Sequence, residues 1–562
     1  MLYTSRMKRL LFLLVMLWAC GGTQEEEVKP APGPTPTAPP KKVTSGDVSF
    51  EIAPLDIKGT VFQPEALDRP GMPLVEAKRA TTVPKQCKLV QTTKEPVQKQ
   101  AQAAILATML YVESKSKPDD KKPKPDESCN KLDDSEGRER ALLKEARQVL
   151  RDVAQQVGDK AIDEITLRLL GSYEIILGDY PAAEKAWAQL IDKDPKSKEL
   201  LTHRAWLAYA QLKQFKNGDA LASLNGEKAD DKEPELAYVM AWAKIRTGDL
   251  AGAWQAISAA ARGWAQNTRR DELEREVLWF AGRGNVPLDQ ATALISGVLV
   301  KVKPQPQQPQ QQYEMLAKLG LSGYALAGRW NDGAAALDKA LEVPGYTAPP
   351  NDLPVIRFSQ ADFTVRLDAP DVAARFAKQA IEAIGVCGDK CADKDKAAKI
   401  QDVYLMGRLF HVVYATANDH RYYQPAHELY ELTIPKLDAA SRTDAEQNMK
   451  KLEATLKNMK VGTGTHDKGA IEALLNRHYL EVSSCYEVVL GTNPKLGGRI
   501  ALSLESDATG AIKGVSTEPK AGAAELSAIA GCIAERAKHW KLPKRGMPGT
   551  TRIKLSYNLA VK

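Results

Sequence analysis

Cysteines are the residues whose chemistry is most constrained by their spacing in this 562-residue sequence, which contains seven of them. Six of them form three successive pairs along the sequence that could be disulfide-bonded: Cys87 with Cys129, Cys387 with Cys391, and Cys485 with Cys532. Disulfide bonds persist in oxidising compartments, so three such pairs indicate an exported protein. The seventh, Cys20, stands alone directly after an apolar run.

Cys485 and Cys532 could also bind a metal ion in place of forming a disulfide bond. His478 lies seven residues before Cys485, and His539 lies seven residues after Cys532. Two cysteines and two histidines could bind zinc in a tetrahedral site. A disulfide bond between Cys485 and Cys532 is the preferred interpretation, because these spacings are wider than those of short zinc-binding motifs and an exported chain favours oxidation.

Patterns typical of enzymes are not found in the sequence. It has no phosphate-binding Gly-x-x-x-x-Gly-Lys-Ser/Thr loop, no His-Glu-x-x-His, no Gly-x-Ser-x-Gly and no haem-type Cys-x-x-Cys-His. Three residues separate Cys387 from Cys391, one more than in the Cys-x-x-Cys redox motif, so we expect a small structural disulfide there, with a metal or redox role as the alternative. His411, His420 and His427 are expected to be surface or capping residues. We therefore predict a non-enzymatic protein without catalytic residues, metal or cofactor.

The N-terminus resembles an export signal. Residues 1–19 begin with basic residues and continue with an uncharged apolar run too short to cross a membrane. Leu17-Trp18-Ala19-Cys20-Gly21 resembles a bacterial lipobox, which implies cleavage before Cys20 and acylation of that residue. A plain secretory signal, with Cys20 incidental, is the alternative. Gly21 and Gly22, directly after Cys20, resemble the residues that direct a lipoprotein to the outer membrane. We therefore expect a lipoprotein on the outer membrane of a Gram-negative bacterium, facing the periplasm.

A proline-rich stretch follows, and it predicts an extended linker over residues 20–46. The charges of the whole chain nearly balance, with 78 basic and 71 acidic residues, so a nucleic-acid partner is not indicated. We expect the chain to be anchored to a membrane by lipid and to bind other envelope proteins.

A repeated turn organises the middle of the chain. Gly178-Asp179-Tyr180-Pro181-Ala182-Ala183 returns 70 residues later as Gly248-Asp249-Leu250-Ala251-Gly252-Ala253, which is two units of about 35 residues. This pattern resembles the tetratricopeptide repeat, a pair of packed helices, and it predicts a helical solenoid. We assign repeats to residues 136–300 and degenerate repeats to residues 313–460, with an ordinary helical bundle as the alternative.

Two further regions belong to this part of the chain. The Gln- and Pro-rich residues 301–312 predict a loop that divides two helical stacks. Residues 47–135 predict a mixed irregular and helical region, in which 48–82 is irregular or β-containing and 97–111 is helical.

The hydrophobic pattern changes in residues 465–562. Helical periodicity over 468–490 is followed by alternating residues over 499–505, a turn, and a second short strand over 512–517. A helix over 523–540 and a strand over 552–561 complete the order α-β-β-α-β. The fold class is therefore mainly α, a tetratricopeptide-like solenoid followed by a small α+β domain.

Residues 465–562 also contain specific sequence motifs. Cys485-Tyr486-Glu487, Leu496-Gly497-Gly498-Arg499-Ile500 and Trp540-Lys541-Leu542-Pro543 resemble the C-terminal domain of the AgmX/PglI family, which is similar to the periplasmic domain of TonB. That resemblance implies gliding-motility machinery. We therefore expect an envelope scaffold that binds partner proteins through its repeats and its C-terminal domain. A lipoprotein that assists outer-membrane protein or surface-polymer assembly or export is the alternative.

Overall fold

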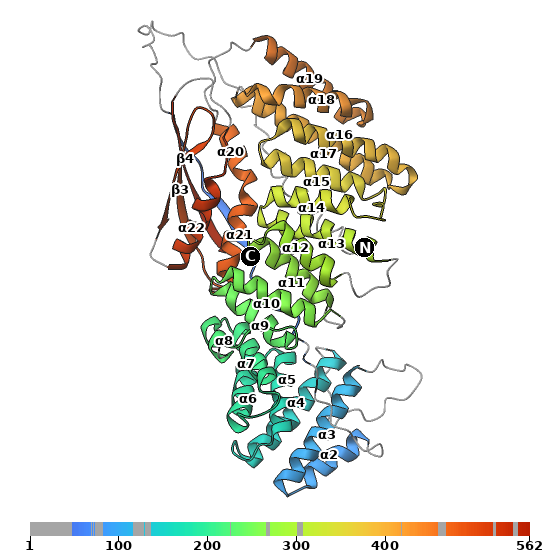
Figure 1. The fold of residues 1–562 in the computed structure, drawn as a ribbon, viewed down its shortest axis with the longest axis vertical. Coiled ribbons are helices and arrows are strands. Elements are labelled where there is room, and N and C mark those ends of the chain that lie inside the picture. The colour runs from blue at the N-terminus through green and yellow to red at the C-terminus, as the bar shows by residue number, and fades with distance from the viewer. Residues whose placement is uncertain are drawn as a thin grey trace, which may run out of the picture. The chain divides into compact units, whose positions relative to one another are not determined.

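Helices make up most of the structure, a computed structural model that describes residues 48–68, 70, 72, 82–115, 129, 137–224, 226–265, 270–299, 307–417, 419–458, 468–520, 524–542 and 549–562 (Figure 1). The predicted signal peptide, Cys20 and nearly all of the predicted linker lie outside these residues. The predicted class, a mainly α solenoid followed by a small α+β domain, is confirmed.

The repeated Gly-Asp turn ends one helix and begins the next. Gly178 follows α5 (Glu164–Leu177) in the left-handed conformation, with φ of +82°, which a residue with a side chain rarely adopts. Asp179 then caps α6 (Tyr180–Lys193) by accepting a hydrogen bond from the backbone N–H of Ala182. The same arrangement joins α9 (Pro234–Arg246) to α10 (Leu250–Gly263), where Asp249 accepts from the N–H of Gly252.

Small residues allow the paired helices to pack closely. A Cβ atom added to Gly171 of α5 would lie 2.6 Å from the indole ring of Trp187 on α6. Ala183 and Ala253, at equivalent positions of the two good repeats, are fully buried. The repeat therefore encodes both the turn and the close approach of the helices.

The remaining helices continue the series on both sides of these repeats. The N-terminal helices are α2 (Val83–Thr92), α3 (Pro96–Lys115) and α4 (Arg138–Val157). The middle ones are α7 (Leu200–Lys213), α8 (Asn217–Ser223), α11 (Arg270–Arg283), α12 (Leu288–Leu294), α13 (Gln308–Lys318), α14 (Trp330–Leu341) and α15 (Leu353–Arg366). They are followed by α16 (Pro370–Cys387), α17 (Asp393–Ala417), α18 (Tyr423–Thr433) and α19 (Ala439–Asn458).

The loop predicted for residues 301–312 is wrong in its second half. Residues 308–312 form the start of α13, in which Pro309 occupies the first turn, where a missing N–H costs no helical hydrogen bond. Residues 301–306 lie outside the described residues. The predicted division into two stacks is not found in the apolar packing of the described residues, because one cluster of buried side chains continues from Ala66 to Phe363.

The C-terminal domain has the predicted order of elements. It contains α20 (Lys468–Arg477), α21 (Tyr479–Leu490), β3 (Gly498–Ser506), β4 (Ile512–Lys520), α22 (Ala524–Ala537) and β5 (Thr551–Val561). The strand β3 pairs antiparallel with both β4 and β5. Apolar side chains of β3 and β5 pack with α21 and α22 in a second core, which is separate from that of the solenoid.

The sheet also contains two strands from the other end of the chain. Both β1 (Val48–Glu51) and β2 (Leu55–Gly59) pair in parallel with β5, one after the other along its length. Pro54 lies between them and has no N–H to donate, which is consistent with the break in the pairing. The region assigned to 47–135 therefore contributes its first residues to the C-terminal sheet, which the sequence analysis did not anticipate.

Candidate peptide-binding face of the solenoid

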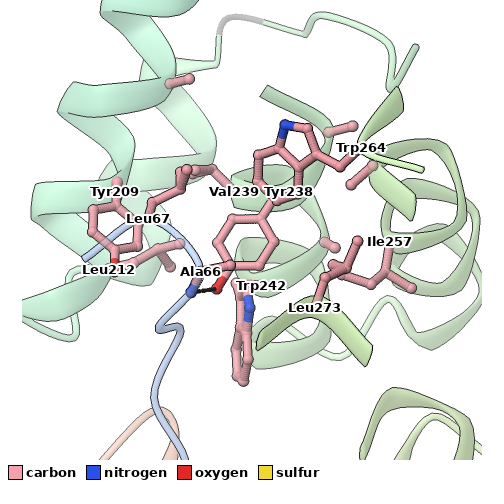
Figure 2. Close-up of a cluster of buried hydrophobic side chains, with 14 of the residues drawn as sticks. Ala66, Leu67, Tyr209, Leu212, Tyr238, Val239, Trp242, Ile257, Trp264 and Leu273 are labelled. Atoms are coloured by element: carbon pink, nitrogen blue, oxygen red, sulfur yellow. Dashed lines mark hydrogen bonds between the residues drawn. The ribbon is translucent and has the colours of Figure 1, made fainter. Parts of the chain in front are cut away.

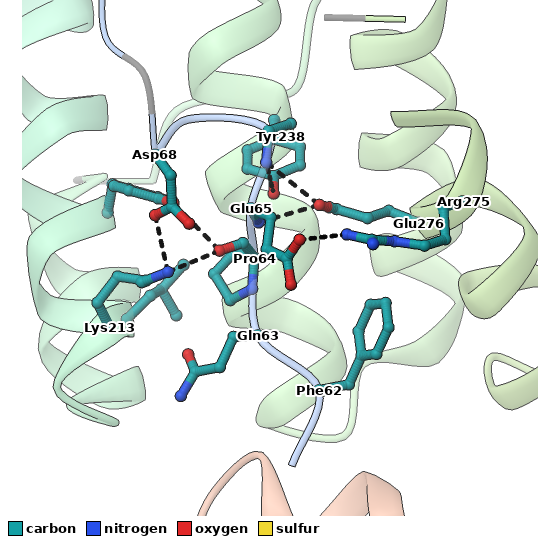
Figure 3. A network of polar contacts seen from close by, with 12 residues as sticks. Phe62, Gln63, Pro64, Glu65, Asp68, Lys213, Tyr238, Arg275 and Glu276 are labelled. Atoms are coloured by element: carbon teal, nitrogen blue, oxygen red, sulfur yellow. Dashed lines mark hydrogen bonds and ion pairs between the residues drawn. The ribbon is translucent and has the colours of Figure 1, made fainter. Parts of the chain in front are cut away.

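The residues that follow β2 lie across three helices of the solenoid. Phe62–Asp68, called here the crossing segment, runs over α7, α9 and α11 (Figure 3). Two residues, Thr60 and Val61, separate this segment from the end of β2. We call the side chains of α7, α9 and α11 that contact it the segment-binding face.

Carbonyl groups of the crossing segment accept hydrogen bonds from cationic side chains. Arg246 of α9 donates through Nη2 to the carbonyl oxygen of Phe62 at 3.2 Å. Lys213 of α7 donates to the carbonyl oxygen of Pro64 at 3.0 Å, and the hydroxyl oxygen of Tyr209 lies 3.1 Å from the same atom. Because these contacts involve main-chain atoms, they do not depend on the side chains of the segment.

The N–H groups of the segment bind a buried carboxylate. Glu276 of α11 accepts through Oε1 from the N–H groups of Glu65 at 3.0 Å and Ala66 at 3.2 Å, and through Oε2 from the indole of Trp242 at 2.9 Å. The N–H of Ala66 is shared with the hydroxyl oxygen of Tyr238 at 3.1 Å. The face thus binds main-chain donors and acceptors between Phe62 and Ala66. The segment ends in a turn, in which the N–H of Asp68 donates to the carbonyl oxygen of Glu65 at 2.9 Å.

An aromatic side chain of the segment lies in a stack of rings. Phe62 is parallel to Trp279 at a centroid distance of 5.0 Å and stacks on Trp242 at 5.8 Å. The guanidinium of Arg275 lies 5.8 Å from the centre of the Phe62 ring. Such offset ring pairs are each worth about 1 kcal/mol beyond the area that they bury.

Two acidic side chains of the segment pair with basic residues of the face. Asp68 binds Lys213 at 2.7 Å and accepts from the hydroxyl of Tyr209 at 2.6 Å. Glu65 forms an ion pair with Arg275 (Figure 3). The face is therefore complementary to an acidic peptide.

The small and apolar residues of the segment are buried between these contacts. Ala66 is 4% exposed and Leu67 is fully buried. Figure 2 shows them in the apolar cluster with Tyr209, Leu212 and Tyr238, from α7 and α9. A larger side chain at the position of Ala66 would have to displace these neighbours.

Two charged groups of the face are buried. Burial raises the pKa of Glu276 to about 7, even though the hydrogen bonds from Tyr238, Trp242 and the segment oppose this shift. Burial lowers the pKa of Arg246 to about 10, and Nη1 of this side chain donates to the carbonyl oxygen of Leu212 at 2.8 Å. Both groups would lose hydrogen-bond partners if the crossing segment left the face.

The C-terminal domain is joined to the solenoid by a second buried carboxylate. Glu481 of α21 accepts from the indole of Trp330 on α14 at 3.0 Å and from that of Trp540 at 2.8 Å. Nδ1 of His478 lies 2.9 Å from Oε1 of Glu481. Burial alone would raise the pKa of Glu481, but the hydrogen bonds from His478 and the two indoles outweigh it and lower this pKa.

The structure joins the six candidate cysteines as disulfides in the three expected combinations. The Cα atoms are 5.6 Å apart for Cys87 and Cys129, 5.7 Å for Cys387 and Cys391, and 5.9 Å for Cys485 and Cys532. In the alternative zinc site, His478 would be a ligand, but its ring stacks on Trp540 at 4.2 Å. Within the described residues, no three His, Cys, Asp or Glu side chains group as metal ligands would. Cys20 lies outside these residues.

Sequence reasoning missed the segment-binding face. The sequence signal for a segment bound in this way is weak. An aromatic residue, a proline and apolar residues occur together, without helical or strand periodicity, in Phe62-Gln63-Pro64-Glu65-Ala66-Leu67-Asp68. Arg246 and Glu276 are charged residues at buried helical positions, and only their burial distinguishes them from surface charges.

Among the helices of the described ranges, none combines the length and the apolar character that a membrane crossing requires. No family model and no curated protein matches the chain. Among solved structures, a match described as the crystal structure of the APC/C hetero-tetramer Cut9-Hcn1 has 14% sequence identity and a TM-score of 0.23, covering 63% of this chain and 85% of that chain. A TM-score this low establishes no shared function.

Proposed function

We propose that this chain is a scaffold that holds other proteins in place in a bacterial cell envelope. The observation that carries the proposal is the crossing segment, whose carbonyl and N–H groups bind side chains of α7, α9 and α11. A surface that binds main-chain carbonyl and N–H groups in this way has the chemistry of peptide recognition. Solenoids of stacked helix pairs commonly provide such surfaces.

The sheet of the C-terminal domain offers a second place for a partner. Among the described strands, β4 pairs with β3 alone. Lys541 bridges Ala511 directly before β4, so we propose that the part of the other edge that follows Ala511 takes an added strand. The contacts of Glu481 with Trp330 and Trp540 join this domain to the solenoid. A partner on the sheet and a partner on the solenoid would therefore be held together by one molecule.

The envelope location rests on sequence features. The lipobox-like residues around Cys20 and the linker to residue 46 support a lipid anchor, and three disulfides suit an oxidising compartment. The resemblance of the C-terminal domain to the AgmX/PglI family supports a place in a gliding-motility or related envelope machine. We propose the outer membrane, facing the periplasm, as the site of attachment.

Photo-cross-linking in intact cells tests the scaffold. A photoreactive residue placed at Lys513 on β4 or at Arg275 on α11 should cross-link to specific proteins, whereas one at Leu221 on α8, which serves as a control position, should not. If neither test position gives a specific product, the scaffold proposal is wrong. Products that include many unrelated outer-membrane proteins would favour the alternative role in outer-membrane assembly.

Fractionation tests the anchor. The Cys20→Ala chain should lose its membrane association and remain folded, because the linker and the solenoid do not depend on the acyl chains. Retention of this variant in the membrane fraction would contradict acylation of Cys20. A Cys387→Ala, Cys391→Ala chain, which removes cysteines without touching the N-terminus, is the matched control and should remain membrane-bound.

A further inference from the structure

We propose that the segment-binding face takes a peptide of a partner protein in place of the crossing segment. The peptide has the chemistry of that segment: an aromatic residue, an acid three positions later, a small residue four positions later and a second acid six positions later. This inference rests on the proposed function and specifies the kind of peptide that the scaffold binds. It follows from the contacts that hold Phe62–Asp68 on the solenoid.

The crossing segment is bound as a ligand would be bound. Among the described residues it has no strand partner, and the main-chain atoms of Phe62, Pro64, Glu65 and Ala66 hydrogen-bond side chains of the solenoid. The helices beneath it satisfy their own backbone groups by helical hydrogen bonds, so they do not need the segment in order to form. Removal of the segment would expose side chains, and it would leave the helical backbone intact.

Emptying the face would expose ionisable groups as well as the apolar contacts of Ala66 and Leu67. Glu276 and Arg246 are buried ionisable groups, and loss of the segment would remove hydrogen-bond partners from both. The raised pKa of Glu276 and the lowered pKa of Arg246 both reflect the cost of burial. A peptide that takes the place of the segment must therefore supply the same hydrogen bonds and apolar contacts.

The side-chain contacts define which peptide fits. Phe62 stacks on Trp279 and Trp242, which requires a flat ring at the first position. Lys213 and Arg275 pair with the acids at the seventh and fourth positions, so that a basic peptide would be rejected. Proline fits at the third position, because the main-chain contact made there is through its carbonyl.

The crossing segment competes with such a peptide from within the same chain. Only Thr60 and Val61 connect it to β2, and a tether this short gives an effective concentration in the millimolar range. A free peptide of the same affinity must reach a comparable concentration to displace it. Removing the segment should therefore strengthen binding of the free peptide by about tenfold or more.

A direct binding measurement tests the proposal. The probe is a fluorescent peptide of residues 60–70, Thr-Val-Phe-Gln-Pro-Glu-Ala-Leu-Asp-Arg-Pro. The two receptors are the unaltered chain and a chain in which residues 62–68 are replaced by glycine and serine. We expect saturable binding to the replaced chain and binding weaker by about tenfold or more to the unaltered one.

Variants assign the binding to the face. Trp279→Ala in the replaced chain should abolish binding, whereas Glu274→Ala, on the same helix but paired with Lys318, should leave it unchanged. A peptide with Ala in place of Phe62, or with Lys in place of Asp68, should bind at least tenfold more weakly. A folded replaced chain that does not bind the peptide, or that binds the Lys peptide equally well, overturns the proposal.

A second measurement decides the outcome if the replaced chain does not fold. A peptide carrying a photoreactive phenylalanine at the position of Phe62 is added at millimolar concentration to the unaltered chain. Cross-linking to α9 or α11, suppressed by excess unlabelled peptide, supports the proposal, and no cross-linking to these helices overturns it. If proteins cross-link in cells but the peptide does not bind, this inference alone fails; if the peptide binds but cells yield no partner, the proposed function fails.

Discussion

Replacing Glu276 by glutamine should change how the stability of the protein depends on pH. Burial raises the pKa of Glu276 to about 7 from an ordinary value of 4.5. The folded state therefore holds this proton more firmly than the unfolded state does. The resulting stabilisation is complete below pH 4.5 and is lost as the pH rises through about 7.

The magnitude follows from the difference between the two pKa values. At 1.36 kcal/mol for each pKa unit, the shift corresponds to about 3 kcal/mol. Glutamine is neutral at every pH and resembles the protonated carboxyl group. Between pH 4.5 and pH 8 the free energy of unfolding of the Glu276→Gln chain should therefore rise by about 3 kcal/mol relative to that of the unaltered chain.

Urea unfolding followed by tryptophan fluorescence measures this difference, because Trp242 is hydrogen-bonded to Glu276. Taking the difference between two chains at each pH cancels the titration of all other groups. Glu446→Gln, at an exposed position of α19, is the control and should give a difference that does not vary with pH. A constant difference for Glu276→Gln from pH 4.5 to pH 8 would refute the reasoning.

Two further changes test the packing that positions the face. Glu481→Ala leaves two buried indole N–H groups without an acceptor and should cost about 3 kcal/mol or more in urea unfolding, with Glu446→Ala near zero. Because its pKa is lowered, the stability that Glu481 provides should be lost as the pH falls through the folded pKa. Gly171→Ala would place a Cβ atom 2.6 Å from Trp187 and should cost about 1 to 3 kcal/mol, whereas Gly385→Ala, which meets nothing within 4 Å, should be neutral or stabilising. Equal melting temperatures for the two glycine variants would contradict this account of the repeat.

Local patterns in the sequence predicted most of the elements. Gly178 and Asp179 predict a turn because a left-handed residue followed by an N-cap is a property of the two residues themselves. The alternation of Ile553, Leu555, Tyr557 and Leu559 predicts a strand with one buried face, and these side chains are buried in the structure. Such signals act within a few residues, so no knowledge of the fold is needed to detect them.

Sequence reasoning failed where the partner is distant. The composition of the glutamine-rich residues 308–312 predicts a loop, but these residues form the start of α13, which packs against α14. Likewise, no residue pattern in Val48–Gly59 indicates that these residues form strands that pair with β5, the last strand of the chain. Arg246 and Glu276 gain their significance only from the segment that covers them.

The sequence by itself determined the period of the helix pairs, their turns, the order of elements in the C-terminal domain and the cysteines available for pairing. Only the tertiary structure decided that the N-terminal strands complete the C-terminal sheet, where Asn558 donates to Asp56 across 502 residues, and that Phe62–Asp68 lies on the solenoid. The physical reason is that extended segments bind through main-chain N–H and C=O groups, which almost every residue carries. Their side chains restrict the choice of partner, but the three-dimensional arrangement of the helices and the sheet selects it.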